Sequence, residues 1–146
     1  MDKCDTTLGE YVLKDYRTKY EIIAENTYDW EFWLGPDGQY LYVSPSAKRI
    51  TGCDPEEFKK DPGLGIRLIH PDDLQIFKAH REVVEKHCQT GEIEFRILHK
   101  DGRTVWISHV CQPIFNKGGQ YLGVRGSNRD ITDRRETQDA LERSEK

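Results

Sequence analysis

Residues 92–132 read EIEFRILHKDGRTVWISHVCQPIFNKGGQYLGVRGSNRDIT, and this stretch decides the fold. Polar and apolar side chains alternate from Glu92 to Ile97, which is the period of a strand with one buried face. Two turn sequences, KDGR at 100–103 and NKGG at 116–119, contain the glycines that hairpin turns require at positive φ. The stretch therefore predicts three consecutive strands that run into a charged helix after Asp130, with one apolar face that the preceding residues must cover.

The composition predicts one domain with a modest core. The chain has 146 residues, of which 33% are charged and 36% hydrophobic, and its formal net charge is −4. This charge gives no reason to expect contact with nucleic acid or an anionic membrane. No apolar run approaches the roughly 18 residues of a membrane span, and the N-terminus lacks the hydrophobic region of a signal peptide. We therefore expect a cytoplasmic location without membrane contact by this segment.

The four cysteines do not indicate a disulfide framework or a metal site. They are widely spread and contain no Cys-x-x-Cys pair: Cys4, Cys53, Cys88 and Cys111. Zinc sites and disulfide frameworks usually show closer, patterned spacing. The spacing favours four reduced thiols, some of them small core residues, and predicts no metal site.

The first ninety residues supply the cover for the sheet. An apolar stripe at three- and four-residue spacing predicts an amphipathic helix over 10–26: Val12, Leu13, Tyr16, Tyr20, Ile23 and Ala24. Two strands, 29–34 and 39–43, flank the turn GPDG. Short helices follow, then a loop at 61–65 and a longer helix from about Pro71 to Cys88. Five strands with helices inserted after the second predict an α+β domain, with one sheet and helices over one of its faces.

This order of elements resembles the PAS sensor domain with its C-terminal PAC segment. The motifs that carry the resemblance are GPDG at 35–38, YVSPS at 42–46, TG at 51–52, PEEF at 55–58, IHPDD at 69–73, EFR at 94–96, KDG at 100–102, Trp106, Gly118, Gly123 and DIT at 130–132. The resemblance covers roughly residues 16–132, and the order and spacing of these motifs are more specific than any one of them. The resemblance implies a five-stranded antiparallel sheet in the order 2-1-5-4-3. It divides the chain into a polar segment with a flanking helix (1–27), the PAS/PAC domain (28–132) and the start of a C-terminal signalling linker helix (133–146).

PAS domains are usually sensory or dimerising input modules of larger signalling proteins, such as histidine kinases of two-component systems and cyclic-di-GMP enzymes (diguanylate cyclases). The resemblance thus implies a module that binds a small ligand in an apolar cavity and relays a signal through its C-terminal helix. The alternative is a ligand-free dimerisation or relay module. This fragment is not expected to be an enzyme, because it has no phosphate-binding loop, no Gly-x-Ser-x-Gly elbow and no His-Glu-x-x-His helix. Ser108-His109 lacks the acid of the kinase phosphoacceptor box, so His109 is interpreted as a structural strand residue.

The resemblance raises two cofactors known in the family, haem and flavin. Haem-binding members commonly ligate iron through a histidine on the long internal helix, where this chain has His80 and His87. Haem at His80 is the less favoured alternative, because helical phase alone does not place the ring. Light-oxygen-voltage members carry a reactive cysteine before that helix, whereas residues 65–70 read GIRLIH, so flavin adduct chemistry is not expected. Asn128 falls where those photosensors place a pocket glutamine.

The candidate site residues form three groups. Pocket candidates are apolar side chains with a few polar groups, and the alternative is that most of them simply pack in the core: Phe32, Tyr42, Ile50, Phe58, Ile69, Phe77, His80, Phe95, Ile97, Trp106 and Asn128. Relay candidates at the exit to the C-terminal helix are Asp130, Ile131 and Thr132. Dimer candidates are Tyr16, Tyr20 and Ile23. The expected partners are a second copy through the flanking helices, an attached effector domain in the parent protein and an unknown small molecule, and nucleic acid is not among them.

Overall fold

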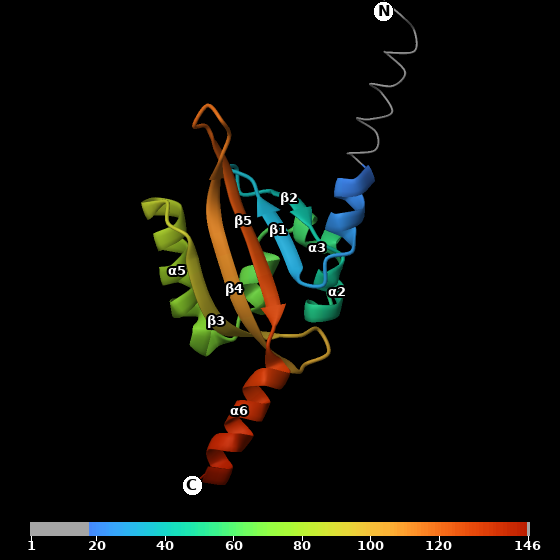
Figure 1. The fold of residues 1–146 in the computed structure, drawn as a ribbon, viewed down its shortest axis with the longest axis vertical. Helices are drawn as coiled ribbons and strands as arrows, with labels where there is room; N and C mark the ends of the chain where they lie inside the picture. The colour runs from blue at the N-terminus through green and yellow to red at the C-terminus, as the bar shows by residue number, and fades with distance from the viewer. Residues whose placement is uncertain (1–17, 146) are drawn as a thin grey trace, which may run out of the picture.

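The computed structural model describes residues 18–145 and contains one five-stranded antiparallel sheet in the order β2-β1-β5-β4-β3 (Figure 1). The strands are β1 (Trp30–Leu34), β2 (Tyr40–Val43), β3 (Gly91–Leu98), β4 (Thr104–Phe115) and β5 (Tyr121–Asp130). The helices are α2 (Ser46–Thr51), α3 (Pro55–Lys60), α4 (Leu64–Leu68), α5 (Leu74–His87) and α6 (Thr132–Glu145), and residues 18–25 are also helical. The predicted α+β class and the 2-1-5-4-3 order are confirmed.

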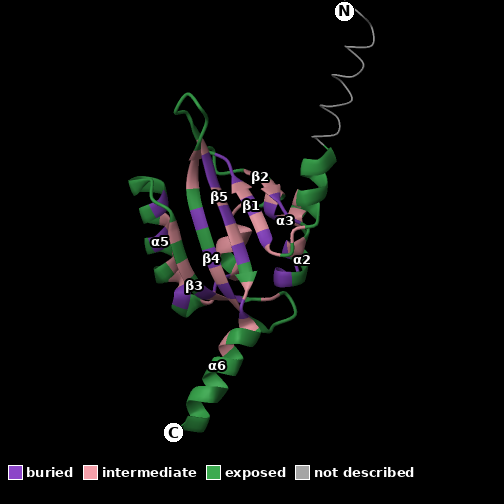
Figure 2. Ribbon diagram, viewed as in Figure 1, coloured by how far each residue is buried: buried purple, intermediate pink, exposed green. Residues whose placement is uncertain are grey.

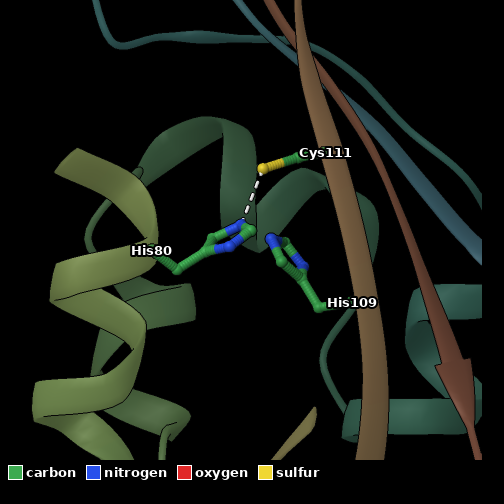
Figure 3. Close-up of side chains that lie close together, drawn as sticks. All are labelled: His80, His109 and Cys111. Carbon is green, nitrogen blue, oxygen red and sulfur yellow. Dashed lines mark hydrogen bonds between the residues drawn. The ribbon is translucent and has the colours of Figure 1, made fainter. Parts of the chain in front are cut away.

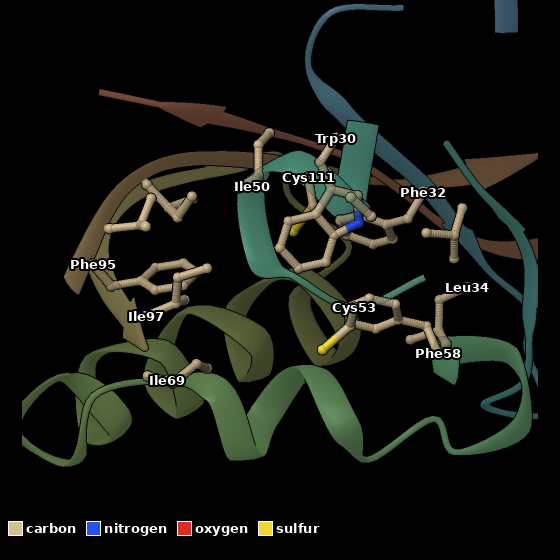
Figure 4. Packing of buried hydrophobic residues seen from close by; sticks show 14 of the residues in the cluster. Trp30, Phe32, Leu34, Ile50, Cys53, Phe58, Ile69, Phe95, Ile97 and Cys111 are labelled. Carbon is tan, nitrogen blue, oxygen red and sulfur yellow. The ribbon is translucent and has the colours of Figure 1, made fainter. Parts of the chain in front are cut away.

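The core lies between the inner face of the sheet and the helices that follow β2. Figure 4 shows side chains from the strands and the short helices meeting there. Phe58 of α3 is fully buried, and its ring centroid lies 5.2 Å from that of Trp30 and 6.3 Å from that of Tyr40. Burying a ring of this size stabilises the fold by about 1.5 to 3 kcal/mol relative to exposing it. The aromatic side chains of β1 and β2 therefore fix the position of α3.

Residues 61–65 were predicted as a loop, and this prediction is wrong at its end, where α4 begins at Leu64. The Leu64 N–H donates to the Asp61 carbonyl at 3.0 Å, and the Arg67 guanidinium pairs with the Asp61 carboxylate. Asp61 thus holds both ends of a single helical turn. A helix of five residues is too short to show apolar periodicity in the sequence.

The long internal helix begins with the 3-10 turn η1 (Pro71–Asp73) and continues as α5. Asp73 is 6% exposed, and its carboxylate accepts three bonds from Arg96 on β3, one from the main-chain N–H and two from the guanidinium. The buried residues of α5 are His80 and Val84, whereas Cys88 at the end of the helix is exposed. His80 therefore belongs to the face of α5 that packs on the sheet.

The two terminal helices lie at the periphery of the domain. Figure 2 shows that α6 and residues 18–25 are mostly exposed, and α6 has no buried residue. Tyr16, one of the three dimer candidates, lies outside the described residues. Within residues 18–145, no helix is both long enough and apolar enough to cross a membrane.

Candidate functional site

The inner face of the sheet has a hollow around Cys111. Strand register pairs Cys111 of β4 with Gly91 of β3 on one side and with Gly126 of β5 on the other. Because neither glycine has a side chain, the ring of His80 packs over Gly91 and the ring of Phe32 packs over Gly126. A Cβ atom at Gly91 would lie 2.5 Å from His80 Cε1, and one at Gly126 would overlap the Phe32 ring. The two glycines thus allow rings from α5 and β1 to close around the thiol.

Three side chains meet in this hollow. His109 lies two residues before Cys111 on β4, so strand alternation places both on the inner face, opposite His80 of α5. The His80 Nε2 atom is 3.0 Å from Cys111 Sγ, and the two imidazole centroids are 4.9 Å apart. Ligand-type atoms of all three residues lie within 4.8 Å of one another, and Figure 3 shows the side chains pointing toward one another. All three are buried.

Asn128 orients the His109 ring. Its Oδ1 atom lies 2.6 Å from His109 Nδ1, and the two residues are directly paired across β4 and β5. An amide oxygen can only accept a hydrogen bond, so His109 Nδ1 carries the proton. The His109 Nε2 atom consequently has a free lone pair.

Burial keeps all three groups of the cluster neutral. Desolvation lowers the pKa of His109 to about 4, although the hydrogen bond that His109 donates to Asn128 partly opposes this shift. Desolvation also lowers the pKa of His80. Burial raises the pKa of Cys111 to about 12, so its thiol is protonated at neutral pH. The cluster consists of two neutral imidazoles and one thiol.

Two small adjoining pockets lie beside the cluster, each of about 50 Å³. They share five lining residues: Phe32, Tyr40, Phe77, Arg81 and His109. Each has room for a few water-sized groups and is well below the roughly 300 Å³ of a drug-sized ligand site. A haem macrocycle does not fit this arrangement, and His80 Nε2 already faces Cys111.

The pockets bring together seven of the eleven pocket candidates: Phe32, Ile69, Phe77, His80, Phe95, Ile97 and Asn128. The structure places the other four elsewhere. Ile50 and Phe58 are core residues that do not line either pocket. Trp106 lies on the outer face, because alternation along β4 cannot place it on the same side as His109. The Tyr42 hydroxyl donates to the carbonyl of Ala24, which belongs to helical residues 18–25, and so lies away from the interior.

Sequence reasoning missed the chemical character of His109 and Cys111. His109 was expected to be structural and Cys111 a small core residue. The sequence pattern that could have identified them is the His-x-Cys spacing on a strand, because this spacing places both side chains on one face. Only the packing of α5 adds His80 to them.

The exit to α6 is held by hydrogen bonds from β4 and β5. The Ile131 N–H donates to the Trp106 carbonyl at 2.9 Å, and the Trp106 N–H donates to Thr132 Oγ1 at 3.0 Å. Asp130 Oδ1 accepts from both the Thr132 N–H, at 2.9 Å, and the Thr132 hydroxyl, at 2.6 Å. The three relay candidates therefore form one bonded junction with the start of β4.

A line of outer-face contacts links this junction to α5. The Arg135 guanidinium of α6 lies 3.9 Å from the Trp106 ring centroid, and that of Arg96 lies 5.3 Å from it. Arg96 is in turn bound by Asp73 at the start of α5. Arg135 also pairs with Glu94 of β3 at 3.6 Å. Contacts thus run continuously from the helix that carries His80 to the helix that leaves the domain.

The chain resembles parts of longer signalling proteins. It is 33% identical over 64% of its length to the white collar 2 protein of Neurospora crassa, and 25% identical over 92% of its length to the signal transduction histidine-protein kinase AtoS of Escherichia coli. It spans 18% and 21% of these two relatives. The crystal structure of a sensory box histidine kinase/response regulator from Burkholderia thailandensis superposes with a TM-score of 0.66 at 25% identity, covering 87% of this chain and 95% of that one.

The family model described as PAS fold matches residues 40–128, which is more than half of the chain. This range contains β2, β3 and β4 entire, almost all of β5 and the helices between them. With the sheet order given above, the match shows that this chain belongs to the PAS fold family.

Proposed function

We propose that this domain is the sensory input module of a larger signalling protein, that a small ligand binds in its interior, and that the signal leaves through α6. The relatives named as histidine kinases support an output of that type in the parent protein, and a cyclic-di-GMP enzyme is the alternative output. The module itself is proposed to sense rather than to catalyse. The cytoplasmic location and the boundaries at residues 27 and 132 stay predictions.

One observation carries the proposal: β4 belongs to both the interior site and the exit. His109 and Cys111 face the pockets from its middle, while the main chain of Trp106, three residues before His109, bonds to Ile131 and Thr132. A ligand that binds between α5 and β4 changes the strand to which α6 is attached. Such a ligand shifts the equilibrium only if it binds one arrangement of this junction more tightly than the other.

The relay is tested by a double-mutant cycle on the output activity of the parent protein. His80→Phe replaces a buried polar ring by an apolar one and is expected to change the output. Asp130→Ala removes the carboxylate that holds Thr132 and should abolish that response to His80→Phe. Asp133→Ala, an acidic residue in the first turn of α6, is the matched control and should leave the response intact.

Two results would refute the relay. One is an output that does not respond to His80→Phe at all, which would disconnect the interior from the effector. The other is a response that is the same size in the Asp130→Ala background as in the wild type, which would leave the junction without a role.

We also propose a homodimer through the N-terminal flanking helix. Tyr20 is 69% exposed and Ile23, three residues later and therefore on the same face of the helix, is 66% exposed, so the rest of the described chain leaves this apolar pair uncovered. Such exposed apolar groups often mark protein contacts. Replacing Tyr20 and Ile23 with Glu should convert a dimer into a monomer in native mass measurements. Leu141→Glu on α6, where the side chain is 58% exposed, is the control that should not. A dimer that survives Tyr20→Glu/Ile23→Glu would exclude this interface.

A further inference from the structure

We propose that His80, His109 and Cys111 form a binding site for one divalent transition-metal ion of borderline softness, such as Zn²⁺. This inference names a ligand class for the interior site and rests on the proposed sensory function only for its role in signalling. The binding itself is a property of the 146-residue chain and is measured on it directly.

The donor set suits such an ion. Imidazole nitrogen and thiolate sulfur are the ligands that zinc and its neighbours prefer. Tetrahedral coordination with normal bond lengths places donor atoms roughly 3.3 to 3.6 Å apart. Here His80 Nε2 and Cys111 Sγ are 3.0 Å apart, and donor atoms of the three residues all lie within 4.8 Å. Small side-chain rotations therefore bring all three to an ion at their centre.

The residues around the two histidines orient their donor nitrogens. Histidine ligands usually donate their other ring N–H to an oxygen, which fixes the tautomer. Asn128 Oδ1 has this role for His109, and leaves Nε2 as the donor toward His80. Gly91 gives the His80 ring its place against the sheet, because any larger residue would occupy the position of that ring. The site is thus built from α5, β3, β4 and β5 together.

The adjoining pocket leaves room for a fourth ligand. It contains about 50 Å³ and is also lined by Glu85 and Arg81, which pair with each other through Arg81 Nε and Glu85 Oε1 at 2.9 Å. A water molecule or the Glu85 carboxylate completes the coordination. The positive charge of Arg81 opposes a cation, and its bond with Glu85 offsets part of that effect. Three protein donors with a fourth position open to water differ from the four protein ligands of a closed structural site.

Binding changes the protonation of one group. The ion forms a bond to Cys111 Sγ, and the thiol proton is released to solvent, so that a thiolate and two neutral imidazoles surround the ion. No electron is transferred in this step. The buried thiolate offsets one of the two positive charges brought into the interior.

The test is titration with Co²⁺, an optical substitute for Zn²⁺, of a background variant with fewer competing thiol and imidazole ligands. That background replaces Cys4 and Cys88 with Ser and His87 with Gln, because exposed Cys88 beside His87 could also bind the ion. The expected result is one equivalent of bound Co²⁺, with a thiolate-to-cobalt charge-transfer band in the near ultraviolet that Zn²⁺ removes. The protein is also refolded in the presence of each ion, so that slow entry into a buried site does not hide binding.

Single substitutions assign the site. Cys111→Ser should abolish the charge-transfer band, and His109→Gln should abolish tight binding. Cys53→Ser, which removes the other buried thiol among residues 18–145, should leave both unchanged. Asn128→Ala should weaken binding by roughly 10- to 100-fold, the usual effect of losing an outer partner of a ligating histidine. Far-ultraviolet circular dichroism of each variant without metal separates loss of binding from loss of fold.

The proposal is overturned if the background variant shows no charge-transfer band after refolding with Co²⁺, a result that does not depend on any ligand variant folding. It is also overturned if a folded Cys111→Ser protein keeps the band. The relay test measures the output of the parent protein and not metal binding, so either outcome here leaves the role of Asp130 to be decided by the double-mutant cycle. Conversely, a failed relay would not alter the measured binding of Co²⁺.

Discussion

The hydrogen bonds between the Asp73 carboxylate and Arg96 should contribute much of the free energy that holds the start of α5 against the sheet. Asp73→Ala removes a carboxylate that accepts three hydrogen bonds from Arg96, at 2.7, 2.9 and 2.8 Å. Asp73 is 6% exposed, whereas the Arg96 side chain is 27% exposed. The substitution therefore leaves a main-chain N–H without its partner and a guanidinium that water can partly reach.

The expected loss follows from these contacts. Hydrogen bonds to a charged group contribute about 1.5 to 3 kcal/mol each, and removing one partner of a buried ion pair costs about 3 to 5 kcal/mol. Water at the Arg96 guanidinium replaces part of the lost interaction, so we expect Asp73→Ala to lower the free energy of unfolding by about 3 kcal/mol. Urea unfolding followed by circular dichroism measures this value.

The neighbouring residue provides the control. Asp72 is exposed, and its Oδ2 atom lies 4.0 Å from the same Arg96 guanidinium. An exposed pair at this distance contributes about 0 to 1 kcal/mol, so Asp72→Ala should change stability little. Equal losses of stability in the two variants, or a loss below about 1 kcal/mol for Asp73→Ala, would refute the claim that the buried Asp73–Arg96 hydrogen bonds hold α5 on the sheet.

Three further predictions follow from the same structure. Arg96 holds the pKa of Asp73 below its ordinary value, so the stabilisation is present above the pKa of the unfolded chain, near 3.9, and is lost as the pH falls through the pKa of the folded protein. The difference in unfolding free energy between wild type and Asp73→Ala should therefore narrow from about pH 6 to about pH 3. A difference that stays constant over this range would contradict the prediction. Gly126→Ala should destabilise the fold by about 1 to 3 kcal/mol in urea unfolding, because the added Cβ overlaps the Phe32 ring. The control Gly118→Ala, at an exposed glycine, should be nearly neutral. Similar values for the two variants would contradict the close packing of the Phe32 ring over Gly126. Phe58→Ala should lower the free energy of unfolding by about 3 to 5 kcal/mol in the same measurement. The control Phe115→Ala, at a half-exposed ring, should lower it by about 1 kcal/mol or less. A small effect of Phe58→Ala would mean that the core closes around the missing ring.

Much of the fold was predictable because it is encoded locally. Alternation from Glu92 to Ile97 and the glycines of two hairpin turns specify β3, β4 and β5 in consecutive order. The strand order came from the family resemblance and is confirmed. The missed helix α4 shows the limit, because its five residues are held by Asp61 rather than by a repeating pattern.

The candidate site was only partly predictable. Seven apolar or polar candidates do line the pockets, since period and composition indicate which residues face inward. Trp106 does not, although it is as large and apolar as the others, because one position along a strand reverses the face. Size and hydrophobicity alone therefore do not identify a pocket residue.

The sequence by itself determined the five strands, the long internal helix and their order along the chain, because strand period, helix period and turn residues depend on neighbours a few positions apart. It also contained the His109-x-Cys111 spacing on one face of β4. Only the tertiary structure decided that His80, 31 residues before Cys111, lies 3.0 Å from its sulfur. The physical reason lies in the strand register: Gly91 and Gly126 flank Cys111 across the sheet, and the space they leave is filled by rings from α5 and β1.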